Sequence, residues 1–235
     1  MRIPPFAALL GAVGLVGCET DLPVAAPSRP AAAGLTSDAL QALRELPVRE
    51  AAPRDGYDRD AFGARWSDID RNGCDQRNDV LSRDLRDVVY RPGTRDCVVT
   101  EGTLLDPYTG TEIDFVRGNR TSSQVQIDHV VALSNAWTTG AQRLDPAERR
   151  QLANDPLNLL AVDGHSNQSK GDRDASEWLP PDPDAHCDYA ERQVAVKAKY
   201  GLWVTRPERH ALERVLASCA GARPTDVLAP GLTPR

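Results

Sequence analysis

The sequence predicts an α+β domain, because strand and turn signals gather in the first half of the chain and capped helices in the second. In the otherwise irregular first half, apolar runs at residues 97–105 and 112–116 flank Asp-Pro-Tyr-Thr-Gly at residues 106–110, a pattern typical of a β-hairpin. In the second half, residues 144–154 are predicted to form a helix from their capping residues, and residues 189–200 a helix ended by Gly201. Separate strand and helix regions are typical of the α+β class.

The remaining elements follow from local patterns. Residues 35–46 carry leucines at helical spacing and predict a short helix, and residues 78–89 predict a short amphipathic helix. Apolar runs at residues 124–132 and 157–162 predict two further strands. A helix is expected to begin at Asn167, shortly after the second of these strands.

Cap residues mark the later helices most clearly. Asp145 is placed to cap the helix at 144–154, Pro146 suits its first helical position, and Glu148 completes a capping box. A final helix is expected to begin after Thr205.

The N-terminus predicts a lipoprotein signal peptide at residues 1–17. A minimal positive start precedes an apolar stretch too short to span a bilayer, and Leu-Val-Gly-Cys at residues 15–18 matches the lipobox of bacterial lipoproteins. Cys18 would then carry the lipid that anchors the protein to a membrane. An ordinary secretory signal with a coincidental cysteine is the alternative, and either signal places the protein outside the cytoplasm, with release from the membrane left open.

Composition divides the rest of the chain into three parts. Residues 18–47 are predicted to form a tether rich in Ala, Pro and Ser that includes one short helix, residues 48–220 the folded domain, and residues 221–235 a disordered tail. No internal repeat is found, and a monomer is expected.

Four cysteines remain after Cys18, and an even number in an exported chain predicts two disulfides. Three connectivities are possible, and the pairs Cys74–Cys97 and Cys187–Cys219 are favoured because each brackets a local unit. A zinc site is the competing interpretation, but no pair has the C-x-x-C spacing.

The formal net charge is −6 and the isoelectric point is near 5.3, which argues against high-affinity, sequence-specific DNA recognition. A nuclease is still compatible with this charge, because a catalytic site needs only local positive charge and a cation.

Three segments carry the chemistry. They are Gln-Ile-Asp-His-Val-Val at residues 126–131, Asn-Leu-Leu-Ala-Val at 158–162 and Asn-Gln-Ser-Lys-Gly-Asp at 167–172. Together they place a carboxylate, an imidazole and two amides at the spacing of a small metal-dependent nuclease site.

These segments resemble the HNH, or ββα-metal, endonucleases. The flanking residues 106–110 and 171–178 narrow the likeness to the secreted actinobacterial branch of that family, and the resemblance runs from about residue 57 to residue 219. It implies a ββα-metal core with additional helices. It also implies hydrolysis of DNA phosphodiester bonds with low sequence specificity, using one Mg²⁺ or Mn²⁺ ion, while RNA remains open as a substrate.

The resemblance assigns a role to each polar residue of the motif. His129 is the general base, Asp128 and Asn167 hold the metal, and Asn158 holds the loop that orients the base. Taken singly, Asp128 and Asn158 would be turn residues, His129 a satisfied interior histidine and Asn167 a helix N-cap. Asp128 and His129 point to opposite sides of a regular strand, so their convergence requires the strand to end there.

Two cations are candidates for substrate contact. Lys170, in the helix that begins at Asn167, is expected to bind a phosphate, with a solvated helix face as the alternative. Arg77 lies three residues after Cys74, which is expected in a disulfide. The resemblance of this segment to the family implies that Arg77 reaches the scissile phosphate, and a structural ion pair is the alternative. His165 could also approach the metal, although it lies outside the motif.

Two other functions are weighed against a nuclease. A cell-wall or polysaccharide hydrolase would suit the location, but no motif supports it. A disulfide-stapled binding module on an inactive nuclease scaffold would leave the motif without a function.

Overall fold

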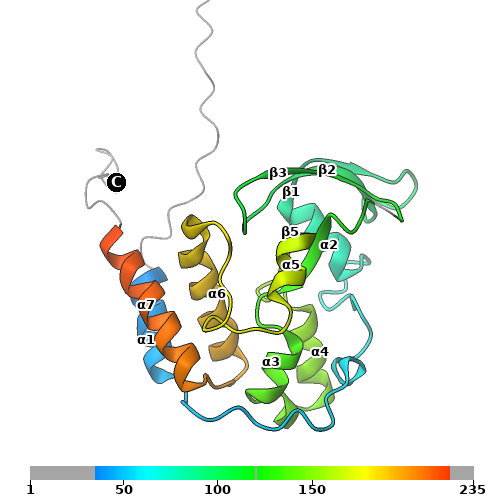
Figure 1. The fold of residues 1–235 in the computed structure, drawn as a ribbon. Helices are drawn as coiled ribbons and strands as arrows, with labels where there is room; N and C mark the ends of the chain where they lie inside the picture. The colour runs from blue at the N-terminus through cyan, green and yellow to red at the C-terminus, as the bar shows by residue number, and fades with distance from the viewer. Residues whose placement is uncertain (1–34, 120, 223–235) are drawn as a thin grey trace, which may run out of the picture. The chain divides into compact units, whose positions relative to one another are not determined.

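The structure is a computed structural model, and it describes residues 35–119 and 121–222 (Figure 1). The predicted signal peptide, Cys18, most of the tether and the tail from residue 223 lie outside the described residues. In chain order the elements are α1 (Leu35–Glu45), η1 (Arg59–Phe62), α2 (Gln76–Asp84), β1 (Leu85–Tyr90), β2 (Val99–Leu105), β3 (Glu112–Val116), β4 (Val125–His129), α3 (Leu133–Thr138), η2 (Ala141–Arg143), α4 (Pro146–Asn154), β5 (Leu159–Asp163), α5 (Gly164–Lys170), η3 (Pro183–Ala185), α6 (His186–Lys199) and α7 (Arg206–Ala222). This mixture of strands and helices confirms the predicted α+β class.

Strands β1, β2 and β3 form an antiparallel sheet in that order. The hairpin predicted around residues 106–110 is confirmed, since Leu105 pairs with Glu112 across it. The helix predicted at residues 78–89 is wrong in its second half, because α2 ends at Asp84 and the chain continues as β1. The backbone turns to an extended conformation at Leu85, which pairs with β2 instead of adding a helical turn.

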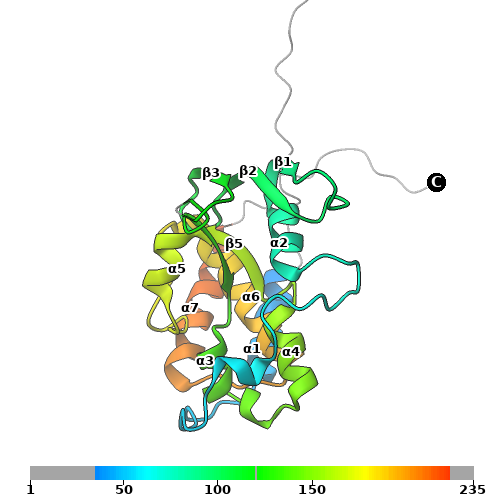
Figure 2. The same ribbon diagram turned by 90° about the vertical axis from the view of Figure 1, so that its right-hand side faces the viewer.

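Strands β4 and β5 form a separate antiparallel pair, and α5 follows β5 directly. Contacts with α5 cover one face of this pair and contacts with α2 reach the other side (Figure 2). The abrupt turn into α5 requires glycine, because a Cβ atom on Gly164 would lie 2.0 Å from the carbonyl oxygen of Ser123. Asp163 caps the helix by accepting a hydrogen bond from the Ser166 amide. The predicted start at Asn167 is therefore wrong, and Asn167 lies inside α5.

Helix α4 confirms the predicted cap. The Asp145 carboxylate accepts hydrogen bonds from the amides of Ala147 and Glu148, and the Glu148 carboxylate accepts one from the Asp145 amide.

Helices α1, α6 and α7 pack against one another around a common apolar core. Leu43 of α1 and Leu46, directly after it, are buried in this core, so the helix predicted within the tether belongs to the folded unit. Helix α7 runs to Ala222, past the expected end of the domain. Among the described helices, none is both long and apolar enough to cross a bilayer.

Two disulfides join neighbouring elements, and both favoured pairings are confirmed. Cys74–Cys97 links the loop before α2 to the loop before β2, and Cys187–Cys219 links α6 to α7.

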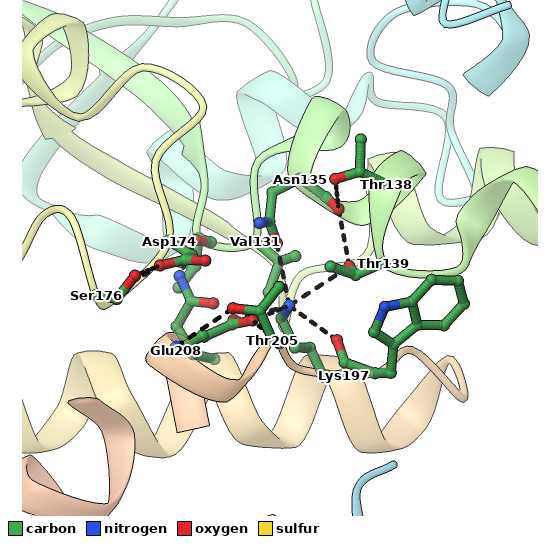
Figure 3. Close-up of polar contacts among 12 residues, drawn as sticks. Val131, Asn135, Thr138, Thr139, Asp174, Ser176, Lys197, Thr205 and Glu208 are labelled. Carbon is green, nitrogen blue, oxygen red and sulfur yellow. Dashed lines mark hydrogen bonds and ion pairs between the residues drawn. The ribbon is translucent and has the colours of Figure 1, made fainter. Parts of the chain in front are cut away.

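A buried ion pair ties α3, α6 and α7 together (Figure 3). The Lys197 ammonium lies 2.7 Å from the Glu208 carboxylate, and neither side chain is exposed to solvent. The ammonium also donates to the side chain of Asn135 and to the carbonyl of Trp203. Glu208 in turn caps α7 together with Thr205, so one carboxylate serves both the helix start and the packing of three helices.

Candidate active site

His129, the last residue of β4, is held in one orientation by a backbone carbonyl. Its Nε2 lies 2.8 Å from the carbonyl oxygen of Ala153, near the end of α4. A carbonyl oxygen only accepts hydrogen bonds, so Nε2 must be the protonated nitrogen of the neutral ring. Nδ1 then carries the free lone pair, which is the atom that a general base needs.

Burial keeps this imidazole neutral. Only 8% of His129 is exposed, and desolvation is the largest influence that lowers its pKa, to about 4. The positive charge of Arg59 acts in the same direction. The ring is therefore neutral at pH 7, with Nδ1 unprotonated.

A pocket opens beside this imidazole. Its lining comprises Arg59, Phe62, Gly63, Ala64, Arg65, Trp66, His129, Leu133, Ala153 and Asn154. The Trp66 ring lies nearly parallel to the imidazole, at 11°, with the ring centres 6.2 Å apart. The pocket thus combines a neutral base, an aromatic face and two guanidinium groups.

Asn158 holds the backbone on both sides of the base. Its side chain is fully buried, accepts a hydrogen bond from the Val131 amide, and donates to the carbonyls of Val131 and Leu152. Val131 follows His129 closely, and Leu152 precedes Ala153, whose carbonyl binds the imidazole. One amide therefore fixes the chain just after His129 and the helix whose carbonyl binds the imidazole.

Asp128 faces the other side of β4. Its Oδ2 accepts a hydrogen bond of 2.6 Å from the Tyr108 hydroxyl, and its Oδ1 accepts one of 2.9 Å from the Lys170 ammonium. Burial, with Asp128 next in effect, raises the pKa of Tyr108 well above its usual value, so this hydroxyl remains a donor. The turn at residues 106–110 thus positions the Tyr108 hydroxyl next to the Asp128 carboxylate.

The expected role of Lys170 does not fit its position. The side chain has no exposed surface, and its ammonium binds Asp128 and the backbone carbonyl of His129. It lies neither on a solvated helix face nor where a phosphate could reach it. The expected convergence of Asp128 and His129 is also absent, because β4 stays regular through the His129–Leu159 pair and the two side chains alternate.

Asn167 shares its surroundings with Gln126, which lies on the same face of β4 as Asp128. The Asn167 amide nitrogen donates to the Gln126 side chain, and no described residue binds its Oδ1. An amide oxygen and a carboxylate on one face are hard ligands that suit Mg²⁺ or Mn²⁺. The chemical types of these two ligands suit such an ion, which would have to share the Asp128 carboxylate with the Tyr108 hydroxyl and the Lys170 ammonium.

The described residues offer no larger cluster of metal ligands. Across residues 35–119 and 121–222, no group of three or more His, Cys, Asp or Glu side chains is arranged to hold a metal ion. Water or substrate oxygens would have to complete the coordination, as is usual for Mg²⁺.

The other candidates lie away from the pocket. Arg77 does not line it, and within the described chain Arg77 has neither a hydrogen bond nor an ion pair. Its pKa is lowered first by burial and then by repulsion from Arg117. His165 is exposed on α5 and makes no described contact with Asp128 or Asn167.

The two arginines and the tryptophan that line the pocket, Arg59, Arg65 and Trp66, were not singled out from the sequence. They belong to an irregular segment without helical or strand periodicity, so no pattern singled them out. The aromatic residues Phe62 and Trp66 in an otherwise polar stretch were the available signal that this segment is anchored to the domain.

Residues 75–215 match the model of the family described as GmrSD restriction endonucleases, C-terminal domain. The chain belongs to this family. The GmrSD match covers more than half of the chain and includes β4, β5 and α5, which carry the motif. It supports a nuclease-type protein, while the HNH assignment and the actinobacterial branch stay predictions.

A relative in Arthroderma benhamiae is 37% identical over 216 residues, which cover 91% of this chain and 98% of the relative. That protein is described as an uncharacterized secreted protein. No solved structure matches the chain.

Proposed function

We propose that this GmrSD family domain is an endonuclease that hydrolyses phosphodiester bonds, with His129 as the general base. The observation that carries the proposal is the imidazole itself, which is fixed through Nε2, neutral at pH 7 and set in an open pocket. Membership of an endonuclease family supports the same reaction.

In this reaction Nδ1 takes a proton from a water molecule, whose oxygen forms a bond to phosphorus while the bond to the leaving oxygen breaks. A low pKa makes the imidazole a weak base, but a phosphate bound in the pocket would raise that pKa by favouring the imidazolium. The Ala153 carbonyl accepts the Nε2 hydrogen throughout, so the ring does not need to turn.

Asp128 and Asn167 are the residues that would hold one Mg²⁺ or Mn²⁺ ion. Such an ion would neutralise charge on the phosphoryl oxygens and stabilise the leaving oxygen. Because Asp128 and His129 face opposite sides of β4, this role requires the Asp128 side chain to turn toward the pocket. The Lys170 ammonium balances the Asp128 charge and holds the carboxylate beside β4.

DNA is the proposed substrate, cut with little sequence preference, since the acidic net charge does not suit tight sequence-specific binding. Export of the protein is supported by the two disulfides and by the secreted relative. The lipid anchor at Cys18 and the monomeric state remain part of the proposal.

The test uses the purified, disulfide-intact protein from residue 35 onward with supercoiled plasmid. Wild type, His129→Ala and the control His210→Ala are compared with Mg²⁺, with Mn²⁺ and with EDTA. His210 is exposed on α7 and lies outside the pocket. Nicking that needs metal and His129, but not His210, is the expected result.

Two outcomes contradict parts of this proposal. Cleavage by His129→Ala would show that another group is the base. A folded wild type that cuts nothing with either metal would favour the inactive binding module.

A further inference from the structure

Two arginines share the pocket with the candidate base. Arg59 begins η1 and Arg65 lies in the loop after it, and both line the pocket beside His129. The pKa of Arg59 is lowered first by partial desolvation of its guanidinium and then by repulsion from Arg65. Arg59 is also near enough to His129 to lower the imidazole pKa.

Neither guanidinium is neutralised. Throughout residues 35–119 and 121–222, no carboxylate forms an ion pair or hydrogen bond with Arg59 or Arg65. Other arginines of the chain are paired, such as Arg54 with Asp172 and Arg86 with Glu112. Two adjacent unpaired cations in an acidic protein repel each other unless an anion lies between or beside them.

The segment that carries these arginines is fixed to the helix that orients the base. Phe62 is buried against α4 residues, and Arg149 of α4 donates to the carbonyl of Ala61. Gly63 has a φ of +80°, and a Cβ atom there would lie 3.3 Å from the Arg150 side chain, so the turn after η1 sits tightly on α4. Because α4 also supplies the Ala153 carbonyl, the same helix holds both the arginine segment and His129 in position.

We propose that Arg59 and Arg65 bind phosphate groups of the substrate strand next to the bond that His129 attacks. The proposal rests on the proposed function and adds the residues that hold the substrate. Guanidinium groups suit this role, because they donate several hydrogen bonds to phosphate oxygens and remain charged. Both arginines precede residues 75–215, so they lie outside the part of the chain that the family model matches.

The test compares Arg59→Gln, Arg65→Gln and the double variant with Arg214→Gln as the matched control. Arg214 is exposed on α7, lies outside the pocket and loses the same single charge. Cleavage is measured in otherwise wild-type protein. Binding of a fluorescein-labelled DNA duplex is measured by anisotropy in the His129→Ala background with Mg²⁺, over a range of salt concentrations.

We expect each pocket substitution to weaken binding about tenfold and to reduce the slope of log K against log salt by about 0.9. Cleavage at subsaturating DNA should fall in parallel, whereas Arg214→Gln should match its parent in binding and cleavage. Circular dichroism and the melting temperature should not change, because both arginines are exposed and make no described ion pair.

The outcomes separate this inference from the proposed function. If wild type cuts DNA but the pocket variants bind and cut like Arg214→Gln, the arginine assignment is overturned and the nuclease stands. If wild type does not cut but binding still depends on Arg59 and Arg65, the pocket assignment stands and the nuclease fails. DNA binding that is absent in the His129→Ala parent would overturn the arginine assignment.

Discussion

Replacing Lys170 by Met should destabilise the protein strongly, because it leaves the Asp128 carboxylate buried without a counter-charge. Asp128 is 4% exposed and Lys170 is fully buried, with 2.9 Å between the ammonium nitrogen and Oδ1. Tyr108 would remain the only described hydrogen-bond donor to the carboxylate. Removing one partner of such a pair costs about 3 to 5 kcal/mol of unfolding free energy.

The pair can be isolated with a double-mutant cycle of Lys170→Met, Asp128→Asn and the combination. Asp128→Asn should also destabilise, because it leaves the ammonium buried with neutral oxygens only. The double variant should lose clearly less than the sum of the two single losses, since it leaves no unpaired charge.

Urea unfolding followed by circular dichroism measures these free energies, at pH 7, with the disulfides intact and with EDTA present to remove bound metal. A cost below about 1 kcal/mol for Lys170→Met, or additive losses for the two substitutions, would contradict this prediction. Either result would mean that Lys170 reaches solvent and that the carboxylate is stabilised by other groups.

Three further predictions concern the base, its support and the second ion pair. In the folded protein the pKa of His129 is lowered from 6.5 to about 4. As the pH falls through this window, His129 is therefore protonated in the unfolded chain but not in the folded chain. The unfolding free energy should therefore drop by up to roughly 3 kcal/mol in wild type, and urea titrations at both ends of the window should show a smaller drop in His129→Asn. Asn158→Ala, which removes three buried hydrogen bonds, should cost about 3 kcal/mol or more in the same assay and reduce cleavage with it. Lys197→Met should cost about 3 to 5 kcal/mol through the unpaired Glu208 but leave kcat unchanged under conditions in which the variant is folded, because this pair lies outside the pocket.

Elements with local determinants were predictable from the sequence. The capping residues of α4 fixed its start, because a cap depends on neighbours three residues away. Strand β1 was not predictable in this way, because residues 85–90 follow a helix directly and become a strand only by pairing with β2. Their intrinsic pattern is short and ambiguous, so the distant partner decides.

In the candidate site, too, residues with a local sequence signal were predictable and residues placed by tertiary contacts were not. His129 was found through a local motif, whereas the position of Lys170 depends on packing. A lysine in a polar helical segment is expected at the surface, and only the contact with a carboxylate on another element explains its burial. Arg59 and Arg65 reach the pocket because Phe62 anchors an irregular segment to α4, which is a tertiary event without a sequence period.

Because side chains alternate between the two faces of β4, the adjacent motif residues Asp128 and His129 lie on opposite faces of the strand. His129 faces α4 and the pocket, while Asp128 faces α5 and Lys170. Because Lys170 binds both Asp128 and the His129 carbonyl, it joins the charged face to the backbone of the base. The negative charge of Asp128 raises the pKa of His129, so a change in that charge would act on the imidazole although the two side chains make no direct contact. It follows that metal binding at Asp128 and substrate binding at the arginines would act on the same imidazole from opposite sides of one strand.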